Sequence, residues 1–238
     1  MNALDALDAA RKMDQQYRYQ RHIYDLSRKY YLLGRERILR EIPLLPGQHL
    51  LEVGCGTGSN LYKLAYRFPE ARLYGLDASE MMLASARAHR RYPRHGRHLH
   101  FSQGLAQQVT PDQFGLEQGF DHVLLSYVLS MIPDWCTAIE QAINSLRPGG
   151  CLHIVDFSDQ ASMPVWFRKL LLQWLDWFHV HPDPEVPAYL QELEARLGGE
   201  LQVAQVMSRY ALIIHYRKQR RSDDAQPETL QIPKYLDF

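Results

Sequence analysis

A short run of residues places an acidic side chain, Glu52, just before three closely spaced glycines, Gly54, Gly56 and Gly58. Glycine lacks a Cβ and tolerates positive φ, so a ligand can approach such a backbone closely. The spacing differs from the G-x-G-x-x-G loop that holds a dinucleotide pyrophosphate, and no Lys-Ser or Lys-Thr pair follows as in a P-loop. Glu52 would repel a phosphate but suits an ammonium group. The run therefore predicts a pocket for a ligand that carries an ammonium group.

The elements around this loop alternate between strand and helix. Apolar runs and turn residues predict strands at 49–53, 71–76, 99–104, 120–128, 151–157, 201–207 and 210–216, and helices at 59–68, 79–86 and 135–146. Such alternation indicates βαβ units with right-handed connections. We expect an α/β fold with a doubly wound, mainly parallel seven-stranded sheet, in which the last two strands form an antiparallel pair.

These landmarks resemble the motifs of class I methyltransferases that use S-adenosylmethionine (SAM). Leu51-Glu52-Val53-Gly54-Cys55-Gly56-Thr57-Gly58 looks like the first motif, Asp77 ends the second strand, and Arg147-Pro148-Gly149-Gly150 precedes the fifth. The resemblance covers about Leu50 to Tyr216 and implies SAM as the cofactor. It places the methionine end of SAM over the glycine loop and the ribose hydroxyls on Asp77. The implied cofactor-binding residues are Glu52, Gly54, Cys55, Gly56, Gly58, Asp77, Ala78, Met82, Gly104, Leu105, Ala106 and Ser126.

Within that set, the resemblance puts Ala78 and Met82 near the adenine, and Gly104 to Ala106 in the wall of the adenine pocket. This chain departs from the family at Leu105, where an acid is common. The departure puts a contact to the exocyclic amine in doubt.

Methyl transfer from SAM mainly requires alignment of the acceptor and exclusion of water, and positioning can supply roughly 7–11 kcal/mol of the barrier. An amine acceptor must also be neutral, so a nearby side chain or water has to accept its proton. Aromatic faces stabilise a quaternary ammonium product. Tyr127 after the fourth strand and His153 and Asp156 at the fifth are the candidate catalytic residues.

The most distinctive segment, from Tyr17 to Arg37, resembles the lead-in to the betaine-lipid methyltransferases. That resemblance implies trimethylation of the homoserine amine of diacylglyceryl homoserine, and a partner enzyme that makes this lipid. The candidate substrate-binding residues are Tyr24, Arg28, Tyr30, Tyr31 and Arg35. Alternatively, the tyrosines pack a helix onto the sheet and the basic side chains are solvated.

A Trp-rich helical stretch, 166–178, interleaves apolar side chains with Arg168 and Lys169. This composition suits an interfacial helix or a lid over an acyl chain, but equally a helix packed on the core. Other acceptors stay open: phosphatidylethanolamine or a soluble amine. A non-catalytic SAM-binding module is the alternative from a different class, although the intact glycines and Asp77 speak against it.

Composition limits the remaining possibilities. Lys plus Arg number 27, as do Asp plus Glu, so no global field points to nucleic acid. Three scattered cysteines show no metal-ligand pairing and fit a reducing compartment. We expect a cytoplasmic protein without a bound metal, whose membrane contact is peripheral. The predicted division is a helical cap at 1–45, a SAM-binding domain at 46–216 with a helical insert at about 158–198, and a polar tail at 217–238.

Overall fold

A computed structural model of the 238-residue chain describes residues 32–88, 98–178 and 180–220. Most of the predicted N-terminal cap and most of the polar tail lie outside these residues. The described end of the cap contains α2 (Arg35–Glu41), which buries Ile38 and Leu39 in the core.

The sheet has seven strands in the order β3-β2-β1-β4-β5-β7-β6. The first five are parallel to one another, and β7 is antiparallel to both β5 and β6. The chain reverses its direction of progress across the sheet between β1 and β4, which is where ligands bind in open α/β sheets. This confirms the predicted fold. The strands are β1 (His49–Val53), β2 (Arg72–Asp77), β3 (Leu99–Gln103), β4 (Phe120–Ser126), β5 (Leu146–Phe157), β6 (Glu200–Val206) and β7 (Ala211–Arg217).

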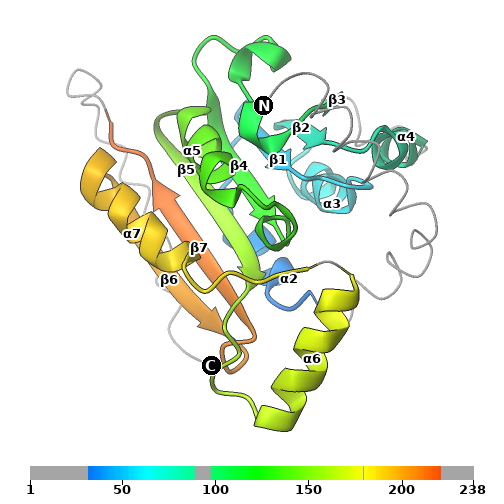
Figure 1. Cartoon of the computed structure of the whole chain (residues 1–238). Coiled ribbons are helices and arrows are strands. Elements are labelled where there is room, and N and C mark those ends of the chain that lie inside the picture. The colour runs from blue at the N-terminus through cyan, green and yellow to red at the C-terminus, as the bar shows by residue number, and fades with distance from the viewer. Residues whose placement is uncertain (1–31, 89–97, 179, 221–238) are drawn as a thin grey trace.

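Helices cover both faces of this sheet (Figure 1). Leu50 and Leu51 are neighbours in β1, yet each belongs to a different apolar cluster, because successive strand residues point to opposite faces. The cluster around Leu50 includes α2, α3 (Ser59–Arg67), α4 (Glu80–Ala88) and α6 (Val165–Trp177). The cluster around Leu51 includes α5 (Trp135–Asn144) and α7 (Val186–Leu197). Short 3₁₀ turns lie at η2 (Ala106–Gln108), η3 (Pro111–Phe114) and η4 (Leu129–Met131).

The start of β5 differs from the prediction. The run Arg147 to Gly150 was expected to separate a helix from a strand that begins at Cys151, but β5 begins at Leu146 and passes through it. The pairing with β4 shifts register between Phe120 and His122, so the Pro-Gly-Gly run forms an irregularity within the strand. A Cβ on Gly150 would lie 2.9 Å from the carbonyl oxygen of Phe120, so glycine is needed where the two backbones approach.

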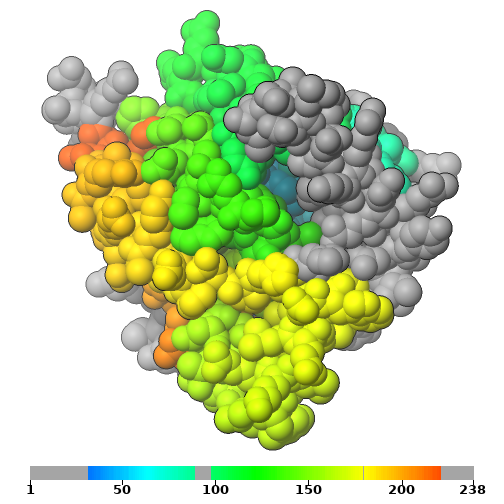
Figure 2. All heavy atoms as spheres, viewed as in Figure 1, coloured from blue at the N-terminus to red at the C-terminus, as the bar shows by residue number. Residues whose placement is uncertain are grey.

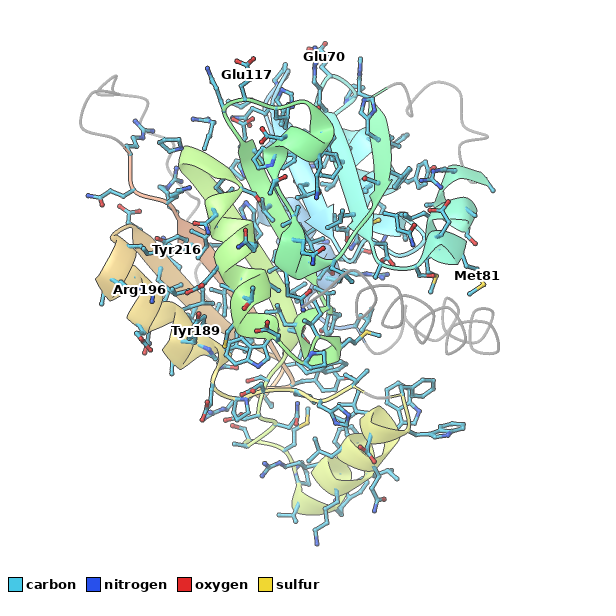
Figure 3. The ribbon with its side chains drawn as sticks, turned by 45° about the horizontal axis from the view of Figure 1, so that its top comes forward. Glu70, Met81, Glu117, Tyr189, Arg196 and Tyr216 are labelled. Atoms are coloured by element: carbon cyan, nitrogen blue, oxygen red, sulfur yellow. The ribbon has the colours of Figure 1, made fainter. Side chains whose placement is uncertain are left out.

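The predicted insert at 158–198 contains two helices, α6 and α7, which differ in how much of their surface packs on the core. On α7, Val186, Leu190 and Leu193 are buried, so this helix is an integral layer of the fold. Its Tyr189 and Arg196, labelled in Figure 3, both bond Glu140 of α5, at 3.0 and 2.5 Å.

Helix α6 buries only Leu171 and Leu175 and projects from the body of the molecule beyond the carboxyl end of β5 (Figure 1). No helix among the described residues is long and apolar enough to cross a membrane.

Candidate functional site

The glycine loop between β1 and α3 is tightly wound. Gly54, Gly56 and Gly58 have φ values of +70°, +54° and +73°, a region that side chains rarely adopt. The N–H groups of Gly54 and Cys55 both donate to the carbonyl of Leu76 on β2, at 2.8 and 3.0 Å. A Cβ on Gly54 would lie 2.3 Å from Cγ2 of Val128, just beyond β4. The backbone at Gly54 therefore lies so close to Val128 that a side chain would clash there.

Asp77, at the end of β2, ties this loop to the next helix. Its Oδ2 accepts the N–H of Gly56 at 2.7 Å, and its Oδ1 accepts the N–H of Ser79 at 2.9 Å. The hydroxyl of Ser79 accepts the N–H of Met82 at 3.3 Å, so Ser79 caps the start of α4. Asp77 thus positions both the loop and the start of α4.

A pocket opens beside the loop, at the carboxyl ends of β1 and β4. The buried Asn60 donates its Nδ2 to Oε1 of the buried Glu52 at 2.7 Å. Asn60 Oδ1 and Ser126 Oγ are buried and have no hydrogen-bond partner among the described residues. The lining residues are Leu32, Arg35, Glu52, Gly54, Cys55, Thr57, Ser59, Asn60 and Ser126.

This donor and acceptor set fits the methionine end of SAM, which is a zwitterion. A buried carboxylate, Glu52, and the amide oxygen of Asn60 would accept from an ammonium group, and the guanidinium of Arg35 complements a carboxylate. Unpartnered buried acceptors are costly, so a ligand that donates to Asn60 and Ser126 would be stabilised there. The residues present therefore fit the implied cofactor.

Cys55 lies in the pocket wall but is not a nucleophile. Burial raises the pKa of its thiol well above the ordinary value, and the nearby carboxylates Asp77 and Glu52 raise it further. The side chain stays neutral, and its role is to pack: its Sγ would lie 2.7 Å from a Cβ on Gly75.

The residues predicted at the adenine lie around Asp77. Gly104 donates its N–H to the carbonyl of Asp77 at 3.0 Å, and the carbonyl of Ala78 accepts from Gln103 at 3.0 Å. Met82 and Ala106 are buried, and Leu105 is half-buried. The structure thus gathers the loops after β2 and β3 at one edge of the sheet. Whether they contact adenine stays a prediction.

Tyr127 follows β4 in a left-handed conformation, with φ of +55°. Its ring is buried and packs edge-on against Phe157, with centroids 4.8 Å apart. Its hydroxyl donates to the carbonyl of Leu33, just before α2. The geometry makes it a positioning residue for the segment that carries Leu32 and Arg35 into the pocket wall.

Replacing Tyr127 by phenylalanine should lower the rate of methyl transfer by about fivefold, because the loss of one hydrogen bond of about 1 kcal/mol loosens that segment. The affinity for SAM should fall by no more than about fivefold, because Arg35 is loosened with the segment while the glycine loop and Asp77 remain. Single-turnover transfer and calorimetry measure the two effects. An unchanged rate would show that the hydroxyl has no positioning role.

Asp156, a predicted catalytic residue, instead accepts hydrogen bonds that hold backbone segments together. Its carboxylate accepts the N–H groups of Leu129, Ser130 and Phe157 at 3.0, 3.3 and 2.8 Å. Burial raises its pKa to about 6. With three backbone donors on its oxygens, this side chain holds η4 against β5, and it does not line the pocket.

His153, predicted as catalytic, is likewise not brought to the pocket. Its Nε2 lies 3.0 Å from Nδ1 of His122, and its Nδ1 lies 2.8 Å from Nδ1 of His215. His215 extends this series of hydrogen-bonded side chains, because its Nε2 lies 3.1 Å from Oε2 of Glu41. Burial, followed by the charges of His122 and His215, lowers the pKa of His153 well below its ordinary value. Both ring nitrogens are therefore engaged inside the fold, and the sequence-based role is not supported.

The buried histidines should make the fold sensitive to acid. Burial lowers the pKa of His122 from 6.5 to about 4, so its contribution to stability is fully present above pH 6.5 and is lost as the pH falls toward 4. This shift corresponds to about 3 kcal/mol. Asp156, with its raised pKa, contributes in the opposite direction over the same range.

A comparison with His122→Gln isolates the histidine, because the Asp156 contribution cancels. The stability advantage of the parent chain over the variant should shrink by about 3 kcal/mol between neutral pH and pH 4. Urea denaturation at each pH measures it. A difference that does not change with pH would mean that His122 titrates normally in the folded state.

Of the predicted substrate-binding residues, Tyr24, Arg28, Tyr30 and Tyr31 lie outside the described residues. Arg35 is in the pocket wall beside Glu52. The sequence reasoning missed Thr57, Ser59 and Asn60, which also line the pocket. For Asn60, the available sequence signal was an asparagine in the first turn of the predicted helix after the loop, because an amide there can reach back to the strand before the loop.

Fold and site together define a class: the molecule has the Rossmann-like fold of class I SAM-dependent methyltransferases. Residues 51–152 match a family described as "Methyltransferase domain". Solved structures agree on the fold. A magnesium protoporphyrin IX methyltransferase from Synechocystis, determined with bound S-adenosylhomocysteine, has a TM-score of 0.59 and 18% identity, covering 79% of this chain and 83% of its own. A SAM-dependent methyltransferase from Aquifex aeolicus has a TM-score of 0.59 and 18% identity, covering 89% and 97%.

Curated relatives match the same region. A trans-aconitate 2-methyltransferase from Methylobacterium radiotolerans is 36% identical over 117 residues, which are 49% of this chain and 41% of the relative. A demethylmenaquinone methyltransferase from Lactococcus lactis is 29% identical over 143 residues, 59% of this chain and 54% of its own. The chain thus spans about half or less of the length of these relatives. Residues 51–152 thus resemble a methyltransferase domain, and the fold is the one seen in class I SAM-dependent methyltransferases.

Proposed function

We propose that this chain transfers a methyl group from SAM to an acceptor at the carboxyl ends of β4 and β5. The observation that carries the proposal is the pocket beside the glycine loop, where Glu52, Asn60 and Arg35 present acceptors and a cation suited to an amino-acid zwitterion. Asp77 lies at the neighbouring strand end, where the ribose would follow.

When bound, SAM would supply a methyl group that its sulfonium already activates. The work of the chain is then to bind, orient and exclude water. Glu52 and Asn60 would receive the ammonium, Arg35 the carboxylate and Asp77 the ribose hydroxyls. The segment anchored by Tyr127 would help to close the pocket, because Leu32 and Arg35 are both in its wall.

For the acceptor we propose a lipid with an amine headgroup, and specifically diacylglyceryl homoserine. The resemblance of residues 17–37 to the betaine-lipid methyltransferases supports this choice, as does the exposed apolar surface of α6, which lies beyond the carboxyl end of β5 (Figure 1). A carboxylate-bearing headgroup also suits the basic residues of that segment. The supplier would be an enzyme that attaches homoserine to diacylglycerol, on a membrane that this protein reaches from the cytoplasm.

A second candidate is a soluble small-molecule acceptor. The names of the relatives favour it, since several are described as trans-aconitate 2-methyltransferases. Such an acceptor would make the exposed face of α6 irrelevant to catalysis.

The test is transfer of labelled methyl from SAM to diacylglyceryl homoserine, phosphatidylethanolamine and trans-aconitate, assayed in parallel with the full chain. Label in the homoserine lipid alone would support the lipid proposal. Label in trans-aconitate alone would replace it with the soluble acceptor. Label in none, with SAM binding intact by calorimetry, would contradict every acceptor named and leave a SAM-binding domain.

A further inference from the structure

Exposed apolar side chains are concentrated on one helix of this molecule. Among the described residues, six of the eleven exposed large apolar side chains belong to α6. Isolated exposed apolar residues are normal on a protein surface, but a contiguous group marks an interaction site. The six are Val165, Trp166, Phe167, Leu170, Leu172 and Trp177.

Three of these six residues lie on one side of the helix. At 100° per residue, Trp166, Leu170 and Trp177 fall within an arc of about 40°. They are 70%, 59% and 72% exposed. The helix packs on the core through the other side, where Leu171 and Leu175 are buried. In Figure 2, α6 forms the rim of the molecule at the bottom of the view, with its outer face turned to solvent.

The charges on α6 favour one kind of partner. Arg168 and Lys169 are exposed in the first half of the helix, and its acid, Asp176, lies 3.7 Å from Nδ1 of His181. At 100° per residue, Lys169 flanks the side of Trp166, Leu170 and Trp177 at about 80° from its centre, whereas Arg168 lies on the opposite side. Tryptophan and leucine on one side of a helix, with a basic residue at its flank, are typical of helices that lie in the interface of a bilayer. Anionic headgroups would complement Lys169 at the flank of that side.

The position of α6 connects this surface to the site. Leu171 and Leu175 belong to the same apolar cluster as Leu32 and Tyr127, and Leu32 lines the pocket. The loop after α6 also bonds η4, through His181 N–H to the carbonyl of Ser130 at 2.7 Å. A helix lying on a membrane would therefore bring the pocket close to the headgroups.

We infer that α6 docks this protein on the surface of an anionic bilayer by inserting Trp166, Leu170 and Trp177 into its interface. The inference rests on the proposed function, because an acceptor held in a bilayer must be reached there. The site for SAM does not depend on it.

The test is sedimentation of the full chain with vesicles of phosphatidylcholine, with and without phosphatidylglycerol. The triple variant Trp166→Ser, Leu170→Ser, Trp177→Ser should lose about tenfold or more in partitioning onto the mixed vesicles. The matched control is Tyr66→Ser with Leu197→Ser, which removes exposed apolar side chains from α3 and α7 and should partition as the parent chain does. Lys169→Gln should weaken binding to the anionic vesicles only, and Arg168→Gln, on the opposite side of the helix, should have the smaller effect.

Three results would overturn the inference. These are a parent chain that does not sediment with anionic vesicles, a triple variant that binds as well as the parent, and a dimer in solution that the triple variant converts to a monomer without any vesicle binding. The last result would assign the face to a second copy. SAM affinity by calorimetry should be the same in all variants, and a short-chain acceptor dispersed as monomers should be methylated equally by parent and triple variant. Loss of transfer with vesicle binding retained would contradict the acceptor and leave the docking intact.

Discussion

Asp77→Ala is expected to reduce SAM binding by at least about 100-fold, because two effects combine. The carboxylate is predicted to bind the ribose, and in the structure it also holds the N–H groups of Gly56 and Ser79 at 2.7 and 2.9 Å. Removing it leaves two buried backbone donors without their acceptor. Each such loss costs about 1–3 kcal/mol. Calorimetric titration with SAM measures the affinity, and urea denaturation measures the accompanying loss of stability.

Two variants separate these effects. Asp77→Asn keeps the size and one acceptor oxygen, so most of the stability should return while SAM affinity stays low. Asp121→Ala is the matched control, since Asp121 is also a buried aspartate that holds a backbone N–H, that of His49 at 2.7 Å, but at the opposite edge of the sheet. It should lose stability and keep SAM affinity. Near-normal binding by Asp77→Ala would contradict the assignment of this residue to the cofactor.

Gly54→Ala should have the second largest effect. The new Cβ would lie 2.3 Å from Cγ2 of Val128, and the φ of +70° is unfavourable for alanine by roughly 1–2 kcal/mol. Overpacking adds typically 1–3 kcal/mol. We expect a loss of several kcal/mol in the free energy of unfolding and about tenfold to 100-fold in SAM affinity, because Gly54 lines the pocket.

The chain offers a close control for this substitution. Gly115 has a φ of +71° with no atom within 4 Å of its added Cβ, so Gly115→Ala measures the backbone strain without the clash. Adding Val128→Ala to Gly54→Ala should relieve the clash and leave the strain. Equal destabilisation by Gly54→Ala and Gly115→Ala would show that Val128 moves aside without cost.

Much of the fold could be predicted because it depends on local patterns. The alternation of strands and helices, Asp77 at the end of β2 and the antiparallel pair β6 and β7 follow from apolar periodicity and turn residues. The start of β5 could not be predicted in this way, because a Pro-Gly-Gly run is typical of the end of a helix or strand. Its inclusion in the strand depends on the close approach of β4, where Gly150 meets the backbone of Phe120.

The candidate site also contains residues that could be predicted from the sequence and residues that could not. The glycine loop and Asp77 were recognisable, because positive φ and a strand-end acid are properties of single positions. The roles predicted for His153 and Asp156 were not supported, because residue type and strand position do not reveal hydrogen-bond partners. His122 and His215, which occupy the ring nitrogens of His153, are 31 and 62 residues away in the chain.

The sequence by itself determined a doubly wound, mainly parallel sheet with a terminal antiparallel pair and a loop that can approach a cofactor, and its resemblance to a family implied the cofactor. The sheet and the loop depend on backbone preferences and apolar periodicity, which are local, whereas the cofactor is what the resemblance of the motifs implies. Only the tertiary structure decided that Asn60 reaches Glu52, that Tyr127 anchors Leu33, and that α7 packs in the core while α6 exposes its tryptophans. Burial and hydrogen bonding of a side chain depend on elements far away in the chain, and these are placed only when the whole core assembles.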